Sequence, residues 1–190
     1  MAVHYKNTDS ITLGNGFITW GTTVVTTAMK STTTELGTLG LLLGDVTFNY
    51  TVDMLKLEAG IPIMLVKQAK RTENASITAE FCEFDALNLR MVTGLPTIDT
   101  TVAGVSKIPF GGAPGGMDVI DKFAFTHVRP DGKVITVFFH KAAASGSLEL
   151  SFSDGAWSSS NVTFEAIADF DQTAGSQLGY ISIASIDLGL

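Results

Sequence analysis

The chain has 190 residues, of which 45% are hydrophobic, so it can bury one sizeable core and general disorder is excluded. Its 12 basic residues stand against 19 acidic ones, and the formal charge of −7 argues against nucleic-acid binding through clustered positive charge. No apolar run approaches the roughly 20 residues of a membrane-spanning helix, so we expect no membrane insertion.

Cysteine content and the start of the chain indicate the compartment. Cys82 is the only cysteine, which excludes a disulfide framework and a thiolate metal site within the chain. Residues Met1–Lys6 lack the apolar stretch that is typical of a signal peptide. We therefore expect synthesis and folding in a reducing cytoplasm.

The first 45 residues carry weak structural signals. Residues 1–16 are polar and punctuated by glycine, which predicts a flexible N-terminal arm. Phe17–Thr27 is rich in Thr and Val, which favours a strand. Met29–Leu43 is rich in Thr and Gly, and its sequence fits either a loop or a weak edge strand.

A strand with strict alternation follows. From Val46 to Asp53 apolar and polar residues alternate, which is the period of a half-buried strand. The phase slips near Met54, because Leu55 and Leu57 are apolar, and this predicts a bulge or a sharp bend.

A turn at Ala59-Gly60 leads to two further predicted strands and one helix. We expect separate strands at Ile61–Lys70 and Ala75–Phe81. A short helix is predicted over about residues 85–93, with Asp85 as its N-cap and Gly94 closing it.

Residues 95–117 form the clearest long loop. They contain three prolines and a glycine run, and so long a loop within a compact domain usually has a role in binding or assembly. The run is not a phosphate-binding loop, because it lacks the lysine and the Ser or Thr of that motif. A flexible surface excursion is the simplest interpretation.

The remainder of the chain reads as a series of strands. Asp131-Gly132 predicts a hairpin turn between two of them. The predicted strands are Val119–His127, Val134–Lys141, Leu148–Phe152, Val162–Ala168 and Leu178–Ile186. About nine strands and one helix predict a mainly β fold, an antiparallel β-sandwich or barrel with one short flanking α-helix, in a single domain spanning residues 1–190.

Candidates for catalysis and metal binding do not form recognisable sites. His4, His127 and His140 show no metal-ligand spacing, and we expect the last two to form a cross-strand surface pair. Cys82 has no histidine near it in sequence that would activate it. Glu80 and Glu83 are an odd number of residues apart and would point to opposite faces of a strand. We expect no enzyme, no metal and no cofactor.

Unprotected strand edges favour self-association. The run Thr22–Thr27 contains no charge and no proline, the residues that usually prevent an edge from pairing with another chain. Such edges are a hazard for a monomer, but they serve a ring of identical subunits whose sheets join.

Three features resemble the tail tube protein family of long-tailed bacteriophages, over roughly residues 45–186. They are Glu58-Ala59-Gly60-Ile61-Pro62 between two long strands, the strand Thr72 to Leu89 leading into the helix, and the C-terminal pattern from Phe139-His140-Lys141-Ala142 through Gly146–Phe152 and Trp157 to Val162–Asp169. The Thr-rich segment at 22–38 and the 95–117 loop match no part of that pattern.

The resemblance implies a structural subunit whose hexameric rings stack into a hollow tube that conducts the viral genome into the host. Two hairpins of each subunit would contribute to a shared inner barrel, here the one at Ala59-Gly60 and one other, such as that at Asp131-Gly132. The candidate lumen-facing residues are Thr47, Asn49, Thr51, Asp53 and Glu58. DNA would slide past them without specific binding, because hydroxyls and carboxylates offer phosphates no cation. An ordinary solvated surface explains this face equally well.

The same resemblance implies contacts and a location. The arm and the 95–117 loop are candidates for ring-to-ring contacts, with Phe110, Gly111, Gly112 and Pro114 at the centre of the loop. Lys56, Lys67, Lys70 and Arg71 either pair with acids of a neighbouring subunit or lie outside the lumen. Partners would be further copies of the chain and other tail proteins such as terminator, tip or tape measure. The protein would belong to the virion tail and assemble in the host cytoplasm.

Two alternatives remain open at this stage. The tube subunit of a contractile secretion or tailocin-like system has the same expected fold. A carbohydrate-binding β-sandwich is the alternative from another class, with Trp20, Trp157, Tyr50 and Tyr180 as stacking platforms. The sequence does not indicate whether the tail contracts, which host is infected or which way the rings point.

Overall fold

The computed structural model describes residues 16–20, 37–39, 45–81, 104–108, 119–129, 133–145 and 159–185, and single residues at 42, 89 and 102. The described strands form one antiparallel sheet. They are β1 (Phe17–Trp20), β2 (Gly37–Leu39), β3 (Thr47–Ala59), β4 (Met64–Phe81), β5 (Ile120–Val128), β6 (Lys133–Ser145), β7 (Ser160–Ile167) and β8 (Gly179–Ser185). The strand order is β2-β1-β5-β6-β7-β4-β3, with β8 paired to β6. The predicted mainly β, antiparallel fold is confirmed, and the sheet of described strands is open rather than closed.

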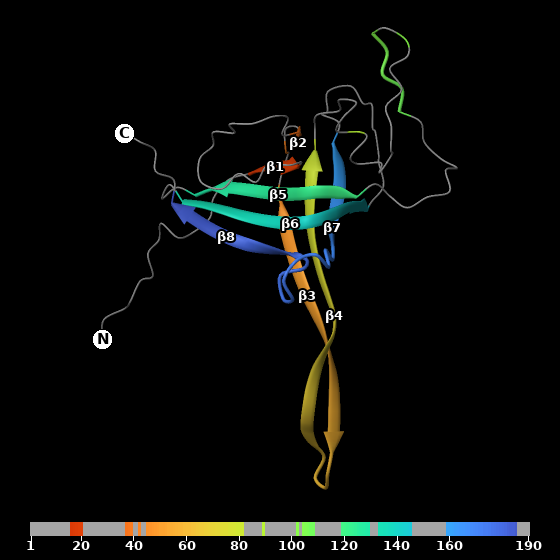
Figure 1. Cartoon of the computed structure of the whole chain (residues 1–190), viewed down its shortest axis with the longest axis vertical. Coiled ribbons are helices and arrows are strands. Elements are labelled where there is room, and N and C mark those ends of the chain that lie inside the picture. The colour runs from red at the N-terminus through yellow and green to blue at the C-terminus, as the bar shows by residue number, and fades with distance from the viewer. Residues whose placement is uncertain are drawn as a thin grey trace.

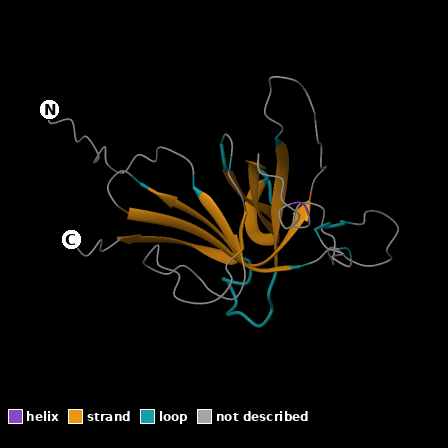
Figure 2. Cartoon of the chain, turned by 90° about the horizontal axis from the view of Figure 1, so that it is seen from above, coloured by secondary structure: helices purple, strands orange, loops and turns teal. Residues whose placement is uncertain are grey.

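Strand β6 connects two layers. One of its edges pairs with β5 from Val134 to Ala142. Its other edge is shared, because β8 pairs with residues 133–139 and β7 pairs with residues 141–145. In Figure 1, β5, β6 and β8 consequently run across β3, β4 and β7, and Figure 2 shows the same crosswise arrangement from above. A strand that changes partners along its length is a common way to turn the corner between two packed sheets.

Aromatic side chains fill the space between the layers. The rings of Phe123 on β5 and Phe164 on β7 lie with centroids 4.5 Å apart, and Phe123 also stacks on Phe139 of β6 at 5.9 Å. Phe81 meets Phe164 edge to face at 6.2 Å. All four phenylalanines are almost completely buried. Alternate apolar positions on β4, β6 and β7 complete this core, as the period of the strands requires.

The β3–β4 hairpin projects from the two layers (Figure 1). Its base is part of the sheet, because Ser76–Phe81 of β4 pair with β7. From Asp53 to Thr72 every residue is exposed. Between Tyr50 and Ala59 the ribbon spans nine residues, about 30 Å at roughly 3.3 Å per residue. Gly60 begins the turn with φ of +101°, a conformation that disfavours side chains with a Cβ.

The prediction of separate strands at 61–70 and 75–81 is wrong, because β4 is one strand of 18 residues. Two bulges explain the misleading pattern. The register shifts between Asp53 and Met54 and again between Leu57 and Glu58, and both shifts insert the extra residue in β4 (Arg71 and Val66). The bulge expected near Met54 is therefore found at that position along the hairpin, but the extra residue is in β4 rather than in β3.

Other predicted elements coincide with the structure or lie outside its description. The backbone N–H of Arg129 donates to the Lys133 carbonyl at 2.8 Å, which closes the β5–β6 hairpin where Asp131-Gly132 predicted a turn. Leu89 is helical, and the rest of the helix predicted at 85–93 lies outside the described residues, as does the strand predicted at Leu148–Phe152. None of the described segments forms a helix of the length and apolar character needed to cross a membrane.

Candidate functional site: a polar sheet face and an open hairpin

Four candidate residues predicted from sequence lie together on one face of β3. Thr47, Asn49, Thr51 and Asp53 alternate along the strand and are all exposed. Their cross-strand partners on β4 are Thr78, Ser76, Asn74 and Thr72, in that order. Since directly opposed residues share a face, the ribbon carries eight small polar side chains on one side.

This polar face continues across the neighbouring strands. Thr78 lies opposite Thr163 of β7, and their hydroxyl oxygens are 2.9 Å apart. Ser145 of β6 donates from its hydroxyl to Oε1 of Glu165 at 2.9 Å. Ser159 likewise donates to Oε1 of Glu80. We call this surface, carried by β3, β4, β7 and the end of β6, the polar face.

Acidic groups outnumber free cations on the polar face. Asp53 lies 3.8 Å from Nη1 of the bulged Arg71. The ammonium of Lys141, at the margin of the face, is 2.9 Å from Oδ1 of Asp169. Both bases thus have an acid beside them. The field over the polar face is consequently set by hydroxyls, amides and carboxylates.

Glu58 lies apart from the other four candidates. It is exposed, but it is five residues beyond Asp53 in a strand with no inserted residue, so it is on the opposite face of the ribbon. The expected phase slip in β3 would have returned Glu58 to the polar face. The slip is in β4 instead.

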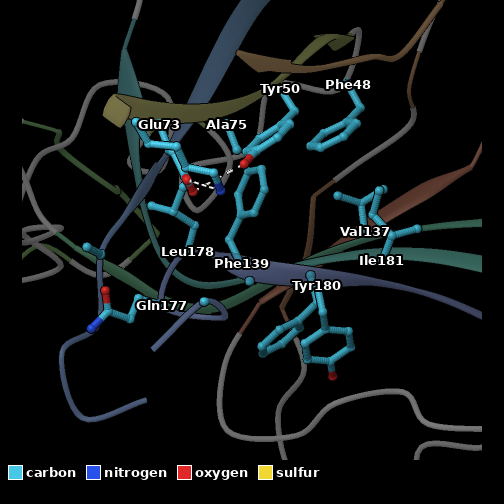
Figure 3. A pocket seen from close by; sticks show the side chains of 15 residues that line it. Phe48, Tyr50, Glu73, Ala75, Val137, Phe139, Gln177, Leu178, Tyr180 and Ile181 are labelled. Carbon is cyan, nitrogen blue, oxygen red and sulfur yellow. Dashed lines mark hydrogen bonds and ion pairs between the residues drawn. The ribbon is translucent and has the colours of Figure 1, made fainter. Parts of the chain in front are cut away.

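The opposite face of the hairpin base borders a groove (Figure 3). Its volume is about 640 Å³, and we call it the corner groove because it lies where the hairpin meets β6 and β8. Phe48 and Tyr50 line it from β3, Val137 and Phe139 from β6, Ile181 from β8, and Leu178 from the preceding loop.

A charged cluster lies at one end of the corner groove. The Tyr50 hydroxyl donates to Oε2 of Glu73 at 3.1 Å, and Nζ of Lys70 is 2.5 Å from Oε1 of Glu73. The hydrogen bond from Lys70 lowers the pKa of Glu73, and the same bond raises the pKa of Lys70. Both side chains therefore stay ionised over a wide pH range, although they are exposed and screened by salt.

Beyond its base the hairpin has two open edges. β3 is the last strand of the sheet, and β4 is paired with β7 only from Ser76 onward. Among the described strands, no partner adjoins the outer edge of either strand between Met54 and Ala75. Exposed apolar side chains occupy the same stretch: Met54, Leu55, Leu57, Ile61, Ile63, Met64, Leu65 and Val66.

The histidine pair expected from the sequence is not formed. His127 lies opposite Ile135, and His140 lies near the other end of β6, where its backbone N–H donates to the Leu178 carbonyl at 3.2 Å. The two histidines are not equally far from the turn, because His127 is four residues before Asp131 and His140 is eight residues after Gly132, so this register places His140 opposite position 122. Within the described residues, no cluster of His, Cys, Asp and Glu could hold a metal ion.

The three described residues among the candidate sugar platforms do not gather in one place. Tyr50 faces the corner groove, whereas the ring of Tyr180 stacks on Phe138 with centroids 4.9 Å apart, on the other side of the β6–β8 pair (Figure 3). Trp20 is half-buried and packs against the core. Trp157 lies outside the described residues.

Other candidate positions cannot be placed. Phe110, Gly111, Gly112 and Pro114, the candidates for ring-to-ring contacts, lie outside the described residues, as do residues 1–15 and Cys82. Sequence reasoning missed the extension of the polar face onto β4, β7 and β6. The polar positions of those strands alternate visibly in the sequence, but alternation does not tell which strands are neighbours.

Comparison with known proteins adds a distant likeness among solved structures. No protein-family model matches the sequence, and no curated protein matches it significantly. Among solved structures, the chain is similar to a protein in the tail of an empty GTA particle, a structure with C6 symmetry. The identity is 13%, the TM-score is 0.41, and the match covers 95% of this chain and 100% of the other. This likeness is too distant to carry a functional conclusion.

Proposed function

We propose that this chain is a structural subunit of a phage-type tail tube, built by copies that join through the β3–β4 hairpin. The observation that carries the proposal is the projecting ribbon, with its two open edges and its exposed apolar side chains. An exposed, long and apolar edge strand aggregates unless a defined partner covers it. In a closed ring each copy covers the edge of the next, and no edge remains open. The sequence features that resemble tail tube proteins support the same assembly.

The polar face is our candidate for the wall of the channel. It carries hydroxyls, amides and the carboxylates of Asp53, Glu80 and Glu165, and it presents few cations to which phosphates could bind. Double-stranded DNA binds proteins mainly through Lys and Arg on its phosphates. A channel lined in this way would let the genome slide without specific binding.

The finer features of the proposal follow from the family that the sequence resembles. They are hexameric rings that stack into a tube, contacts with other tail proteins, assembly in the host cytoplasm and a final place in the virion tail. The role is structural, without catalysis and without a cofactor.

Electron microscopy combined with hydrogen exchange tests the proposal. The purified full-length chain is imaged over a range of concentrations, and amide exchange in β3 is compared between dilute and concentrated samples. We expect rings or tubes of uniform bore, with protection gained at alternate residues of β3, because only alternate N–H groups point away from β4. A chain that stays dispersed at high concentration, with β3 unprotected, overturns the proposal. Retention of that dispersed chain on polysaccharide would favour the carbohydrate-binding alternative.

A further inference from the structure

The tip of the hairpin has apolar side chains with nothing to cover them. Ile61 is 104% exposed and Ile63 is 75% exposed, and they are at the end of the projecting ribbon. Together with the neighbouring residues 64–66, each at least half exposed, they form a continuous run of exposed apolar side chains. A patch of this kind marks a contact surface.

The corner groove is a second uncovered apolar surface. Its floor is formed by the buried side chains of Val137 and Phe139, while Tyr50 remains 48% exposed and Ile181 56% exposed at its borders. Ile183, two residues along β8 on the same face as Ile181, extends the apolar surface and is 62% exposed.

The hairpin of one chain does not reach its own corner groove. Phe48 and Tyr50, which line the groove, are at the base of the ribbon, and Ile61 is at its far end, about 30 Å away by roughly 3.3 Å per residue. A continuously paired two-stranded ribbon does not fold back through its own base. A covering hairpin must therefore come from another copy.

Charge favours the same pairing of surfaces. Residues 54–71 contain four bases (Lys56, Lys67, Lys70 and Arg71) against one acid (Glu58), a surplus of three positive charges in a chain whose net charge is −7. Residues 159–185, which form β7, the loop beside the groove and β8, contain three acids (Glu165, Asp169 and Asp171) and no base. Lys70 and Arg71 already pair with Glu73 and Asp53 inside the hairpin. Lys56 and Lys67, nearer the tip, form no ion pair among the described residues. The acid that they can meet is the exposed Asp171, because Asp169 is held by Lys141 and Glu165 lies on the polar face.

We propose that the hairpin tip of one copy seats in the corner groove of the next copy. Ile61 and Ile63 pack against Val137, Phe139 and Ile181 of the neighbour. Lys56 and Lys67 lie on opposite faces of the ribbon, and one of them approaches Asp171 in the neighbour's loop 169–178. The two surfaces differ, so the contact is head-to-tail, and its repetition closes a ring when the rotation from one copy to the next divides a full turn. This inference rests on the proposed self-assembly and adds which surface meets which.

Cysteine cross-linking under assembly conditions tests the contact. The background is the full-length chain with Cys82→Ser, so that introduced thiols are the only ones. Ile63→Cys and Ile181→Cys are made singly and together and then oxidised. The double variant should form a ladder of covalent oligomers on a non-reducing gel, and the mixed single variants should form dimers only. Ile63→Cys paired with Val102→Cys, at an exposed position that does not line the groove, should give no ladder.

The outcomes separate this inference from the proposed function. If rings or tubes form but the 63–181 pair gives no more product than the 63–102 control, another surface covers the groove and the inference falls while self-assembly stands. If micrographs show no assembly of the unmodified chain at any concentration, the proposed function falls and this contact falls with it. A second variant, Ile61→Asp with Ile63→Asp, changes only exposed positions. It should leave the thermal midpoint unchanged and reduce assembly at least tenfold, and undiminished assembly would also overturn the contact.

Discussion

At the scale of single residues, Asp169 organises the loop that borders the corner groove. Its backbone N–H donates to the Gln177 carbonyl at 2.9 Å, and its carboxylate accepts hydrogen bonds from Lys141 and from the amide of Gln172. Only 9% of Asp169 is exposed. The backbone of Asp169 thus joins the two ends of the loop and its side chain ties the loop to β6, and this fixes the wall of the groove beside Leu178.

The Lys141–Asp169 pair predicts an acid-sensitive contribution to stability. The hydrogen bond from Lys141, followed by that from Gln172, lowers the pKa of Asp169 below its ordinary value. A lowered carboxyl pKa in the folded state stabilises the fold at pH values above the unfolded pKa of about 4, and this stabilisation is lost as pH falls through the folded pKa. Asp169→Asn should therefore lower the urea midpoint at pH 6 and leave it closer to wild type at pH 3. Glu58→Gln, at an exposed carboxylate near the hairpin tip, is the control and should change neither midpoint. Equal destabilisation by Asp169→Asn at both pH values would contradict the ionic role.

The same pair also makes stability depend on pH in the alkaline range, where stability falls as pH rises. The hydrogen bond to Asp169 raises the pKa of Lys141, so its contribution is complete below the unfolded lysine pKa of about 10.4 and is lost only as pH rises through the folded value. The pair is thus intact throughout the neutral range. Lys141 is 36% exposed, and added salt should weaken the effect.

At the scale of elements, the hairpin has faces of opposite character at its base. One face carries Phe48, which packs against the core, and Tyr50, which borders the corner groove, and the other carries Thr47, Asn49, Thr51 and Asp53. Further out, Leu55 and Leu57 follow on the formerly polar face. Bulges increase the local twist of a two-stranded ribbon, so the outer part of each face need not point in the same direction as its base. The apolar outer stretch then suits a neighbour, while the polar base suits a channel.

Thr51→Lys tests the polar face as a channel wall. In an assembly of identical copies the substitution repeats in every subunit and places a ring of cations on that face. We expect assembled tubes of the variant to retain short double-stranded DNA, with affinity that falls steeply between 50 and 200 mM salt, as counterion release requires. Val128→Lys adds the same charge at an exposed position on β5, outside both the polar face and the proposed subunit contact, and its tubes should retain no more DNA than wild type. Equal retention by the two variants would show that the polar face is not the channel wall.

At the scale of the whole molecule, a small group of rings joins the two layers. Phe164 contacts Phe123 at 4.5 Å and Phe81 at 6.2 Å and is fully buried, so it touches strands from both layers. The hairpin and the corner groove keep their relative positions only while this contact holds. Assembly therefore depends on residues that no neighbouring copy touches.

Phe164→Ala should destabilise the fold by about 3–5 kcal/mol, because it removes a large buried side chain and leaves a cavity. Chemical denaturation followed by circular dichroism measures the change. Phe164→Leu, a smaller truncation, keeps the test informative if the alanine variant does not fold. Phe170→Ala, at a position 81% exposed, should change stability by no more than about 0.5 kcal/mol. Similar losses at positions 164 and 170 would refute this account of the core.

Local alternation in the sequence was sufficient to predict the mainly β class, most of the described strands, the turns at Ala59-Gly60 and Asp131-Gly132, and the polar residues from Thr47 to Asp53. These features depend on neighbours within a few residues, and a period of two is visible without a partner strand. Only the tertiary structure decided that β4 is continuous, that β7 lies beside it and that Glu58 leaves the polar face. Each of these depends on strand order and register, which are set by packing between residues far apart in the chain, and a bulge in one strand reverses faces without any mark in the sequence of its partner.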